Sequence, residues 1–353
     1  MNGGNYLNQN EYYYRRTVSA IGFSLLIWVG FFEIFGVIVS YIFPLLSKAF
    51  FQNAPVVSTV VNQVAYAAGY LTGFMLPVLF LRRFIKRTGY SYQPMYSLPS
   101  VSPWLPLIIL SGVTIVFSAA YLNSALMNLI GYDPSVFATD LLTDSSDPKL
   151  YELILDFIVV CLVPGFCEEF LFRGAILSNC LPFGKGKAIL ISALLFSLMH
   201  RNPAQILYTF VAGILLGIIY VKTKSIWNCV ILHTVNNFVS NTEVVIQSHL
   251  KDRFFAMTWI QLLEILLFTL GIISTVILIL RFFSKKDTEV REGIFAKNLP
   301  EGDDYVLCPI SPERAKRLFM APSMVVFMAL CVLQILLLLV IVIVGGSLLE
   351  LLG

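Results

Sequence analysis

The feature that most constrains this sequence is a series of long apolar stretches separated by short polar ones. Most of them are long enough to cross the roughly 30 Å of hydrocarbon in a bilayer. The stretches cover residues 17–46, 59–81, 104–130, 151–181, 188–200, 204–221, 226–246, 259–280 and 323–343. A backbone in lipid finds no water to bond, so such stretches must be helical. The sequence therefore predicts an all-α, polytopic transmembrane helix bundle of about nine helices, a multi-pass protein of the cell membrane.

Composition supports this interpretation and excludes other classes of protein. Hydrophobic residues make up 58% of the chain and charged residues only 13%, whereas a soluble domain carries about 25% charged residues. There are too few charges to cover a surface that faces water, which excludes soluble, disordered and nucleic-acid-binding proteins. The six cysteines lie far apart without a Cys-x-x-Cys pair, so neither a disulfide framework nor a zinc knuckle is expected.

The basic residues are distributed unequally between the two sides of the predicted bundle. With the N-terminus in the cytoplasm, 18 of the 24 Lys and Arg residues fall on the inner side and five on the outer side. The remaining one, Arg173, lies inside a span. This bias follows the positive-inside rule. We therefore expect a cytoplasmic N-terminus and a cytoplasmic position for the polar segment 285–322.

These features predict a linear organisation of the chain. It comprises a cytoplasmic N-terminal segment (1–16), three transmembrane helices (17–148), four helices that carry the candidate site (149–247), an eighth helix (248–284), a polar cytoplasmic insert (285–322) and a C-terminal transmembrane helix (323–353). The fourth span contains Pro164-Gly165, which predicts a kink. Gly69-x3-Gly73 and Gly213-x3-Gly217 predict close helix packing.

Polar residues inside a membrane are costly and need an explanation. Glu33 and Glu264 are isolated acids in the first and eighth spans, but the fourth, fifth and seventh spans hold clusters. The clusters are Glu168, Glu169 and Arg173 in the fourth span, Phe196 and His200 in the fifth, and His233 and Asn237 in the seventh. Residues four apart share a helix face, so an ion pair is expected between Glu169 and Arg173. Glu168 points about 100° away from Glu169, which leaves it available for chemistry.

The expected depths of these residues place the three clusters at a similar level in the membrane. Glu168 and His200 both lie about 20 Å from the inner turn that joins their helices, and Asn237 lies about 18 Å up its own helix. A buried hydrogen-bond network could explain one His with one Asn. Two acids, one Arg, two His and an Asn at similar depth favour a functional site. A carboxylate can act as general base toward water, and His can bind water or metal or stabilise an oxyanion.

The order of these motifs resembles that of a known family. Glu168-Glu169-x-x-x-Arg173, Phe196-x-x-x-His200 and His233-x-x-x-Asn237 are similar to the three motifs of the CPBP intramembrane proteases. That family includes the type II CAAX prenyl endopeptidases and bacteriocin-processing or immunity-associated membrane proteins. The resemblance covers about 80 residues. The insert and the last helix look like additions to the family's core.

The resemblance implies hydrolysis of a peptide bond in a membrane-embedded, prenylated or exported peptide. Glu168 would activate water, His200 would hold it, and His233 and Asn237 would stabilise the oxyanion, with Glu169 and Arg173 in support. Glu168, His200 and His233 could also be three ligands of a catalytic zinc ion. A metal-free glutamate mechanism fits the same residues, and both remain open at this point. The alternative is a non-catalytic protein on the same fold, such as an immunity factor, a scaffold or a transporter component.

Three other side chains near the motifs could be nucleophiles. Cys167 points about 100° away from the face of Glu168. Ser197 and Thr234 lie close to the two His residues, and each is expected to bond a carbonyl of its own helix. We therefore expect a water-mediated reaction without a covalent acyl-enzyme.

Overall fold

The computed structural model describes residues 3–51, 53–87, 103–132, 149–181, 184–250, 254–283 and 320–352, and this part of the chain forms helices without any strand. The first helix, α1 (Gly3–Val37), continues through the π-helical η1 (Ile38–Ile42) into α2 (Phe43–Phe51). The fourth span runs through α5 (Leu150–Asp156), η3 (Phe157–Leu162), α6 (Val163–Glu169), η4 (Phe170–Leu177) and α7 (Ser178–Cys180). The other elements are α3 (Pro55–Arg87), α4 (Leu105–Leu129), α8 (Lys185–His200), η6 (Pro203–Gln205), α9 (Ile206–Thr223), α10 (Ile226–Leu250), α11 (Phe254–Phe283) and α14 (Pro322–Leu352).

Each of the nine predicted spans is helical, which confirms a polytopic, membrane-embedded helix bundle. Within the described residues, seven helical segments are long and apolar enough to cross a bilayer. The two predicted spans outside this set are α8, which has only 16 residues, and α10. α8 is too short to cross a bilayer as a regular helix. α10 has 25 residues, but its polar side chains, among them His233 and Asn237, lower its mean hydropathy.

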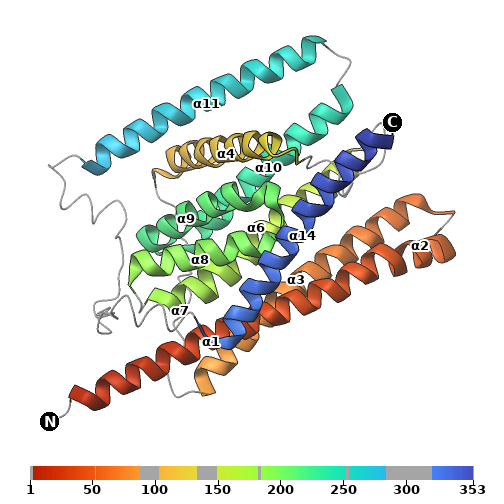
Figure 1. Ribbon diagram of the computed structural model, residues 1–353. Helices are drawn as coiled ribbons and strands as arrows, with labels where there is room; N and C mark the ends of the chain where they lie inside the picture. The colour runs from red at the N-terminus through yellow and green to blue at the C-terminus, as the bar shows by residue number, and fades with distance from the viewer. Residues whose placement is uncertain are drawn as a thin grey trace.

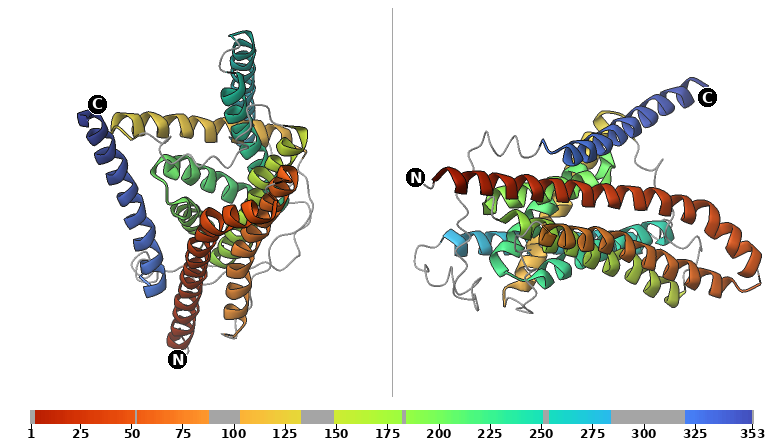
Figure 2. Two further views of the ribbon diagram at one scale, coloured as in Figure 1. Left: turned by 90° about the vertical axis from the view of Figure 1, so that its right-hand side faces the viewer. Right: turned by 90° about the horizontal axis from the view of Figure 1, so that it is seen from below.

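The helices pack as an irregular bundle in which distant parts of the sequence lie side by side (Figures 1 and 2). α8 and α9 form a closely packed pair, α11 lies on α4, and α1 packs against both α3 and α14. Small residues permit the closest approaches, as predicted: a Cβ atom on Gly213 would lie 2.8 Å from Ala193 Cα, and one on Gly73 would lie 2.5 Å from the ring of Phe32. Both contacts lie inside the bundle.

The fourth span departs from regular α-helix on both sides of Pro164-Gly165. The π-helical η3 precedes this dipeptide and the π-helical η4 follows Glu169. Short π-helical stretches frequently mark functional sites, because they change the direction of side chains within one helix. Gly165 also allows α10 to approach, since a Cβ atom there would lie 3.1 Å from the backbone nitrogen of Thr234. The expected irregularity is thus distributed over two π-helical stretches.

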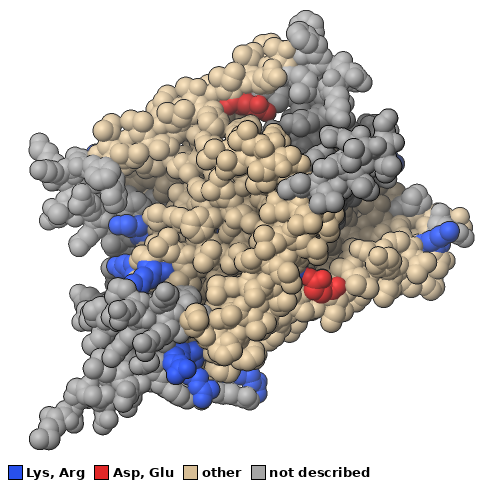
Figure 3. Space-filling view, viewed as in Figure 1, with Lys and Arg blue, Asp and Glu red and all other residues tan. Residues whose placement is uncertain are grey.

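Lys and Arg side chains lie mostly at one end of the molecule, the end that holds the N-terminus (Figure 3). We call it the Lys/Arg-rich end; it carries Arg15, Arg16, Arg82, Arg83, Lys185, Lys187, Lys222, Lys224 and Arg281. The middle of the visible face is almost free of charge, as expected for a surface in contact with lipid. The predicted insert 285–322 falls almost entirely outside the described residues.

The interpretation of Glu33 as an isolated acid needs correction. Glu33 is not isolated, because its carboxylate pairs with Arg201 at the end of α8. Arg201 also donates to Gln334 Oε1 of α14 at 2.9 Å and lies over the ring of Trp28. This contact between α1, α8 and α14 is remote in sequence, so helical periodicity could not reveal it. Glu264 is partly buried on α11.

Candidate active site

A cavity of about 720 Å³ lies among α1, α3, α6, α8, α9 and α10. Its wall contains Glu168, His200, His233 and Asn237, the four residues that the sequence placed at similar depth. Three separate helices therefore do bring these side chains to one space. Glu169 and Arg173 do not line the cavity; both side chains are 0% exposed behind it.

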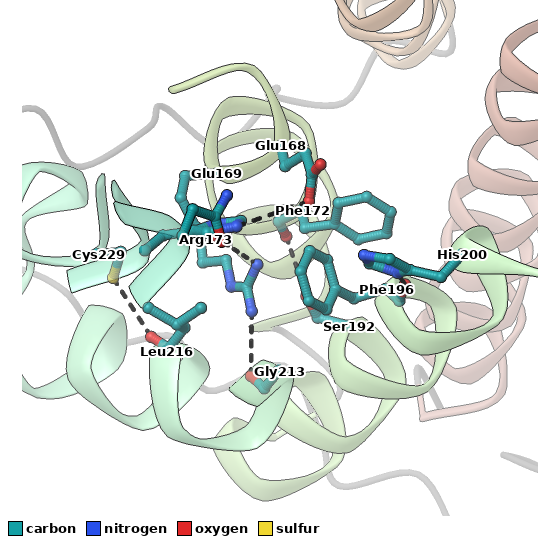
Figure 4. Close-up of polar contacts among 12 residues, drawn as sticks. Glu168, Glu169, Phe172, Arg173, Ser192, Phe196, His200, Gly213, Leu216 and Cys229 are labelled. Atoms are coloured by element: carbon teal, nitrogen blue, oxygen red, sulfur yellow. Dashed lines mark hydrogen bonds and ion pairs between the residues drawn. The ribbon is translucent and has the colours of Figure 1, made fainter. Parts of the chain in front are cut away.

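Glu169 and Arg173 form the ion pair expected from their spacing (Figure 4). Arg173 Nη1 lies 2.8 Å from Glu169 Oε1, and Nη2 donates to the carbonyl oxygen of Gly213 at 3.3 Å. The guanidinium also lies over the ring of Phe196, 4.5 Å from its centroid. A buried charge is tolerated only when it is paired and hydrogen-bonded. These contacts supply both conditions and connect η4 with α8 and α9.

His233 is bound to the same carboxylate. Its Nδ1 donates to Glu169 Oε1 at 2.8 Å, because a carboxylate can only accept. In the neutral ring this fixes Nε2 as an acceptor. Nε2 lies 3.9 Å from Glu168 Oε2, too far for a direct hydrogen bond and suited to a bridging water. Glu169 thus orients His233 toward Glu168.

Glu168 is held on its other oxygen by a residue from the second span. The hydroxyl of Tyr70 in α3 donates to Glu168 Oε1 at 2.5 Å. Glu168 Oε2 is buried and has no hydrogen-bond partner among the described residues. The carboxylate of Glu168 is therefore fixed at one oxygen and unpartnered at the other, on the side of His233.

His200 is oriented in the same way as His233. Its Nδ1 lies 2.8 Å from the carbonyl oxygen of Phe196, one turn earlier in α8, which makes Nδ1 the donor and leaves Nε2 as the acceptor. The ring of Phe196 packs edge-on against both His rings, with centroid distances of 5.0 Å to His200 and 5.9 Å to His233. The Phe of the Phe-x-x-x-His motif therefore spaces the two imidazoles.

Asn237 lines the cavity one turn beyond His233 on α10. Its Nδ2 lies 3.5 Å from the carbonyl oxygen of Val160, a long contact that leaves the amide able to donate elsewhere.

None of the three alternative nucleophiles lines this cavity. Cys167 is buried, and Ser197 Oγ donates to the carbonyl oxygen of Ile206 at 2.7 Å. That carbonyl belongs to α9, so the expected bond within the helix of Ser197 is wrong. The expectation for Thr234 is also wrong, because its Oγ1 has no hydrogen-bond partner among the described residues and lies against Gly165.

The donor types at the site are ones that zinc accepts, but their arrangement does not fit a three-ligand site. Zinc holds His nitrogen and carboxylate oxygen at about 2.0–2.2 Å. Among the described residues, no three His, Cys, Asp or Glu side chains come close enough together to share a metal ion. Glu168 and His233 approach each other, and His200 does not complete the set.

Sequence reasoning missed several polar residues in the cavity wall. Tyr66 and Tyr70 come from α3, Tyr208 from α9, and the amides Gln63 and Gln205 lie beside them. The spacing Tyr66-x-x-x-Tyr70 places two hydroxyls on one face of an otherwise apolar span, and this was an available signal.

Residues 150–239 match the family model described as type II CAAX prenyl endopeptidase Rce1-like. This segment is Rce1-like. The match confirms the resemblance found in the three motifs and includes all six residues of the predicted site. At the level of the family it supports an intramembrane CAAX-type protease. No curated protein and no solved structure matches the chain.

The Rce1-like segment supplies only part of the cavity. Trp28, Phe32, Gln63, Tyr66 and Tyr70 line it from α1 and α3, outside the matched residues. The chemistry-bearing motifs and much of the wall that faces them therefore come from different parts of the sequence.

Proposed function

We propose that the protein is an intramembrane endopeptidase that hydrolyses a peptide bond of a membrane-associated, prenylated or exported peptide. The observation that carries this proposal is the carboxylate of Glu168. Tyr70 fixes one of its oxygens, while the other is unpartnered and lies 3.9 Å from His233 Nε2 at the wall of a cavity. A water molecule between these two atoms could donate one hydrogen to each.

The reaction follows from this arrangement. Glu168 takes a proton from the water as its oxygen attacks the carbonyl carbon of the scissile bond. The second hydrogen of the water is accepted by Nε2 of His233 or of His200, which orients the water, and Asn237 Nδ2 donates to the oxyanion. Glu168 then returns the proton to the leaving nitrogen as the carbon–nitrogen bond breaks. The products are a carboxylic acid and an amine, and no atom of the protein becomes covalently bound.

This assignment changes one role that the resemblance implied. His233 would be an oxyanion donor only if Nε2 carried a hydrogen, whereas its bond to Glu169 places the hydrogen of the neutral ring on Nδ1. We therefore assign His233 to the water and the oxyanion to Asn237. Replacement of Asn237 by Ala should lower turnover by about 10²–10³, the usual cost of losing one oxyanion donor.

The central test is Glu168→Gln, which keeps size and hydrogen bonding but removes basicity. The purified variant should lose nearly all turnover of a defined membrane peptide and still bind it. Cys167→Ser and Ser197→Ala are matched controls that should stay active. Substantial turnover by Glu168→Gln would contradict the assignment of Glu168 as the base. Absence of turnover by the wild-type protein would favour a non-catalytic role. Comparison of cellular peptides between wild type and Glu168→Ala identifies the substrate.

The dependence on metal is tested separately. Because no three donors are gathered around one point, metal-free protein should keep full turnover. Inactivation by a strong chelator, restored by zinc at about one ion per chain, would overturn the glutamate mechanism in favour of a catalytic zinc.

A further inference from the structure

Several of the helices that line the cavity contribute residues mainly from one half of their length. α3 contributes Gln63, Tyr66 and Tyr70, all from the half that lies away from its basic C-terminal end. α8 contributes its last residues, up to His200, and α9 contributes residues from Tyr208 to Leu216, most of them in its first half. Because α8 begins and α9 ends at the Lys/Arg-rich end, these residues lie mostly toward the opposite end of the bundle.

The seventh span lines the cavity along its middle. α10 starts at the Lys/Arg-rich end, just after Lys224, and it lines the cavity from Leu232 onward. Past His233 the lining residues become more exposed, and Ser240 is an exposed member of the cavity wall. The space beside Glu168 therefore extends toward the end opposite the Lys/Arg-rich end.

Toward the Lys/Arg-rich end the interior is closed by packed side chains. Phe172, Ile176, Leu177 and Tyr220 are each 0% exposed, and the Tyr220 hydroxyl lies 2.6 Å from Ser178 Oγ. The ion pair of Glu169 and Arg173 forms the boundary between this packed region and the cavity. A peptide that came from that end would have to displace several buried side chains before it reached Glu168.

The open half of the cavity has the chemistry of a peptide site. Its wall carries neutral amide and hydroxyl groups that can both donate to and accept from a peptide backbone. They are Gln63, Gln205, Asn236, Asn237, Ser240 and Asn241. Asn236 Oδ1 is buried and has no hydrogen-bond partner among the described residues, so it offers an acceptor to a bound N–H.

We propose that the substrate enters from the side opposite the Lys/Arg-rich end, and that this is the extracytoplasmic side. The positive-inside rule places the Lys/Arg-rich end in the cytoplasm. The substrates are then exported or membrane-anchored peptides whose scissile bond lies in the outer half of the bilayer. This inference rests on the proposed peptidase function for the nature of the substrate, but the direction of the opening rests on the structure alone.

Cysteine labelling tests the direction of the opening without any substrate. The parent protein carries Cys308→Ser, because the other five cysteines are buried. Ser240→Cys places a thiol at the cavity wall, and Lys185→Cys places one at the exposed start of α8. A membrane-impermeant maleimide added to intact cells should label Ser240→Cys and leave Lys185→Cys unmodified. Inverted vesicles should give the opposite pattern. Labelling of Ser240→Cys only in inverted vesicles would overturn the proposal.

An activity measurement connects the opening with catalysis. A soluble quenched-fluorescence peptide library should be hydrolysed by right-side-out vesicles, with Glu168→Gln vesicles as the blank. A charged thiol reagent added outside should block hydrolysis by Ser240→Cys and spare Lys185→Cys. Hydrolysis by inverted vesicles alone would overturn the direction of the opening. Absence of any hydrolysis above the blank in both vesicle types, with the predicted labelling pattern, would instead reject the peptidase function and leave the direction standing.

Discussion

The two oxygens of Glu168 have different surroundings, and this difference is the basis of the proposed chemistry. Oε1 accepts a hydrogen bond from Tyr70, whereas Oε2 is buried, has no partner among the described residues and lies 3.9 Å from His233 Nε2. Glu169, its neighbour in sequence, is bound by both Arg173 and His233. Of these two adjacent carboxylates, Glu168 lines the cavity, whereas Glu169 lies behind it and binds Arg173 and His233.

The contact of Tyr70 with Glu168 predicts a positioning role. A hydrogen bond to a charged group contributes about 1.5–3 kcal/mol, so Tyr70→Phe should lower kcat by about 10- to 100-fold. KM should change little, because the substrate keeps its own contacts. Tyr66→Phe, one turn away in the same cavity wall, is the matched control and should retain kcat. Equal kcat values for the two variants would contradict the role of Tyr70.

The buried pair predicts a loss of stability. Removal of one partner of a buried ion pair commonly costs about 3–5 kcal/mol, because the other charge is left uncompensated. Arg173→Ala should therefore unfold at a lower temperature in detergent and give less folded protein. Glu168→Ala is the control and should unfold close to wild type, since its carboxylate lies at the cavity wall. Wild-type thermal stability of Arg173→Ala would argue against a contribution of the pair.

What the sequence could predict at this scale depended on whether partners share a helix. Glu169 and Arg173 lie four residues apart, so helical geometry alone predicted their contact. The hydrogen bond from His233 to Glu169 joins α10 to α6, and the one from Tyr70 to Glu168 joins α3 to α6. Matched depth showed that His233 and Glu168 could meet. It could not show which atoms would pair, because that depends on the rotation of each helix about its axis.

At the scale of elements, the position of the site depends on close packing between α8 and α9. A Cβ atom on Gly213 would lie 2.8 Å from Ala193 Cα, and the carbonyl of the same glycine accepts from Arg173. Any increase in the separation of the two helices therefore also weakens a contact of the buried pair. The Gly-x-x-x-Gly spacing predicted close packing, but the sequence did not indicate that Arg173 would use this backbone.

Gly213→Ala should consequently destabilise the protein. Overpacking of a close contact typically costs about 1–3 kcal/mol, which should lower the unfolding temperature in detergent. Gly186→Ala is the matched control, because a Cβ atom there meets nothing within 4 Å and alanine favours a helix. An unfolding temperature for Gly213→Ala as high as that of the control would show that this contact does not limit how closely α8 and α9 pack.

At the scale of the whole molecule, apolar length and charge bias predicted the class of fold, and long-range packing escaped prediction. α14 lies against α1 although some 300 residues separate them, and Ser323 Oγ donates to the carbonyl oxygen of Ser19 at 2.9 Å. Arg201, Glu33 and Gln334 add a polar contact among three helices. The terminal helix is therefore packed onto the core, and no local pattern in the sequence specifies which helix it contacts.

The charge bias also predicts the orientation of the insert 285–322, which should be cytoplasmic. Cys308 is a native reporter, because the five other cysteines are buried. An impermeant maleimide should leave Cys308 unmodified in intact cells and label it after permeabilisation. Efficient labelling from outside would show that the whole bundle has the opposite orientation.

The division of the cavity between the Rce1-like segment and the first two helical spans has an evolutionary consequence. Glu168, His200, His233 and Asn237 can stay unchanged while Trp28, Phe32 and Tyr66 on the facing wall diverge. A lineage can then acquire a new peptide preference by mutation in α1 and α3 without rebuilding its hydrolytic apparatus. Chimaeras that exchange 1–87 between such proteins should inherit cleavage preference from the N-terminal donor.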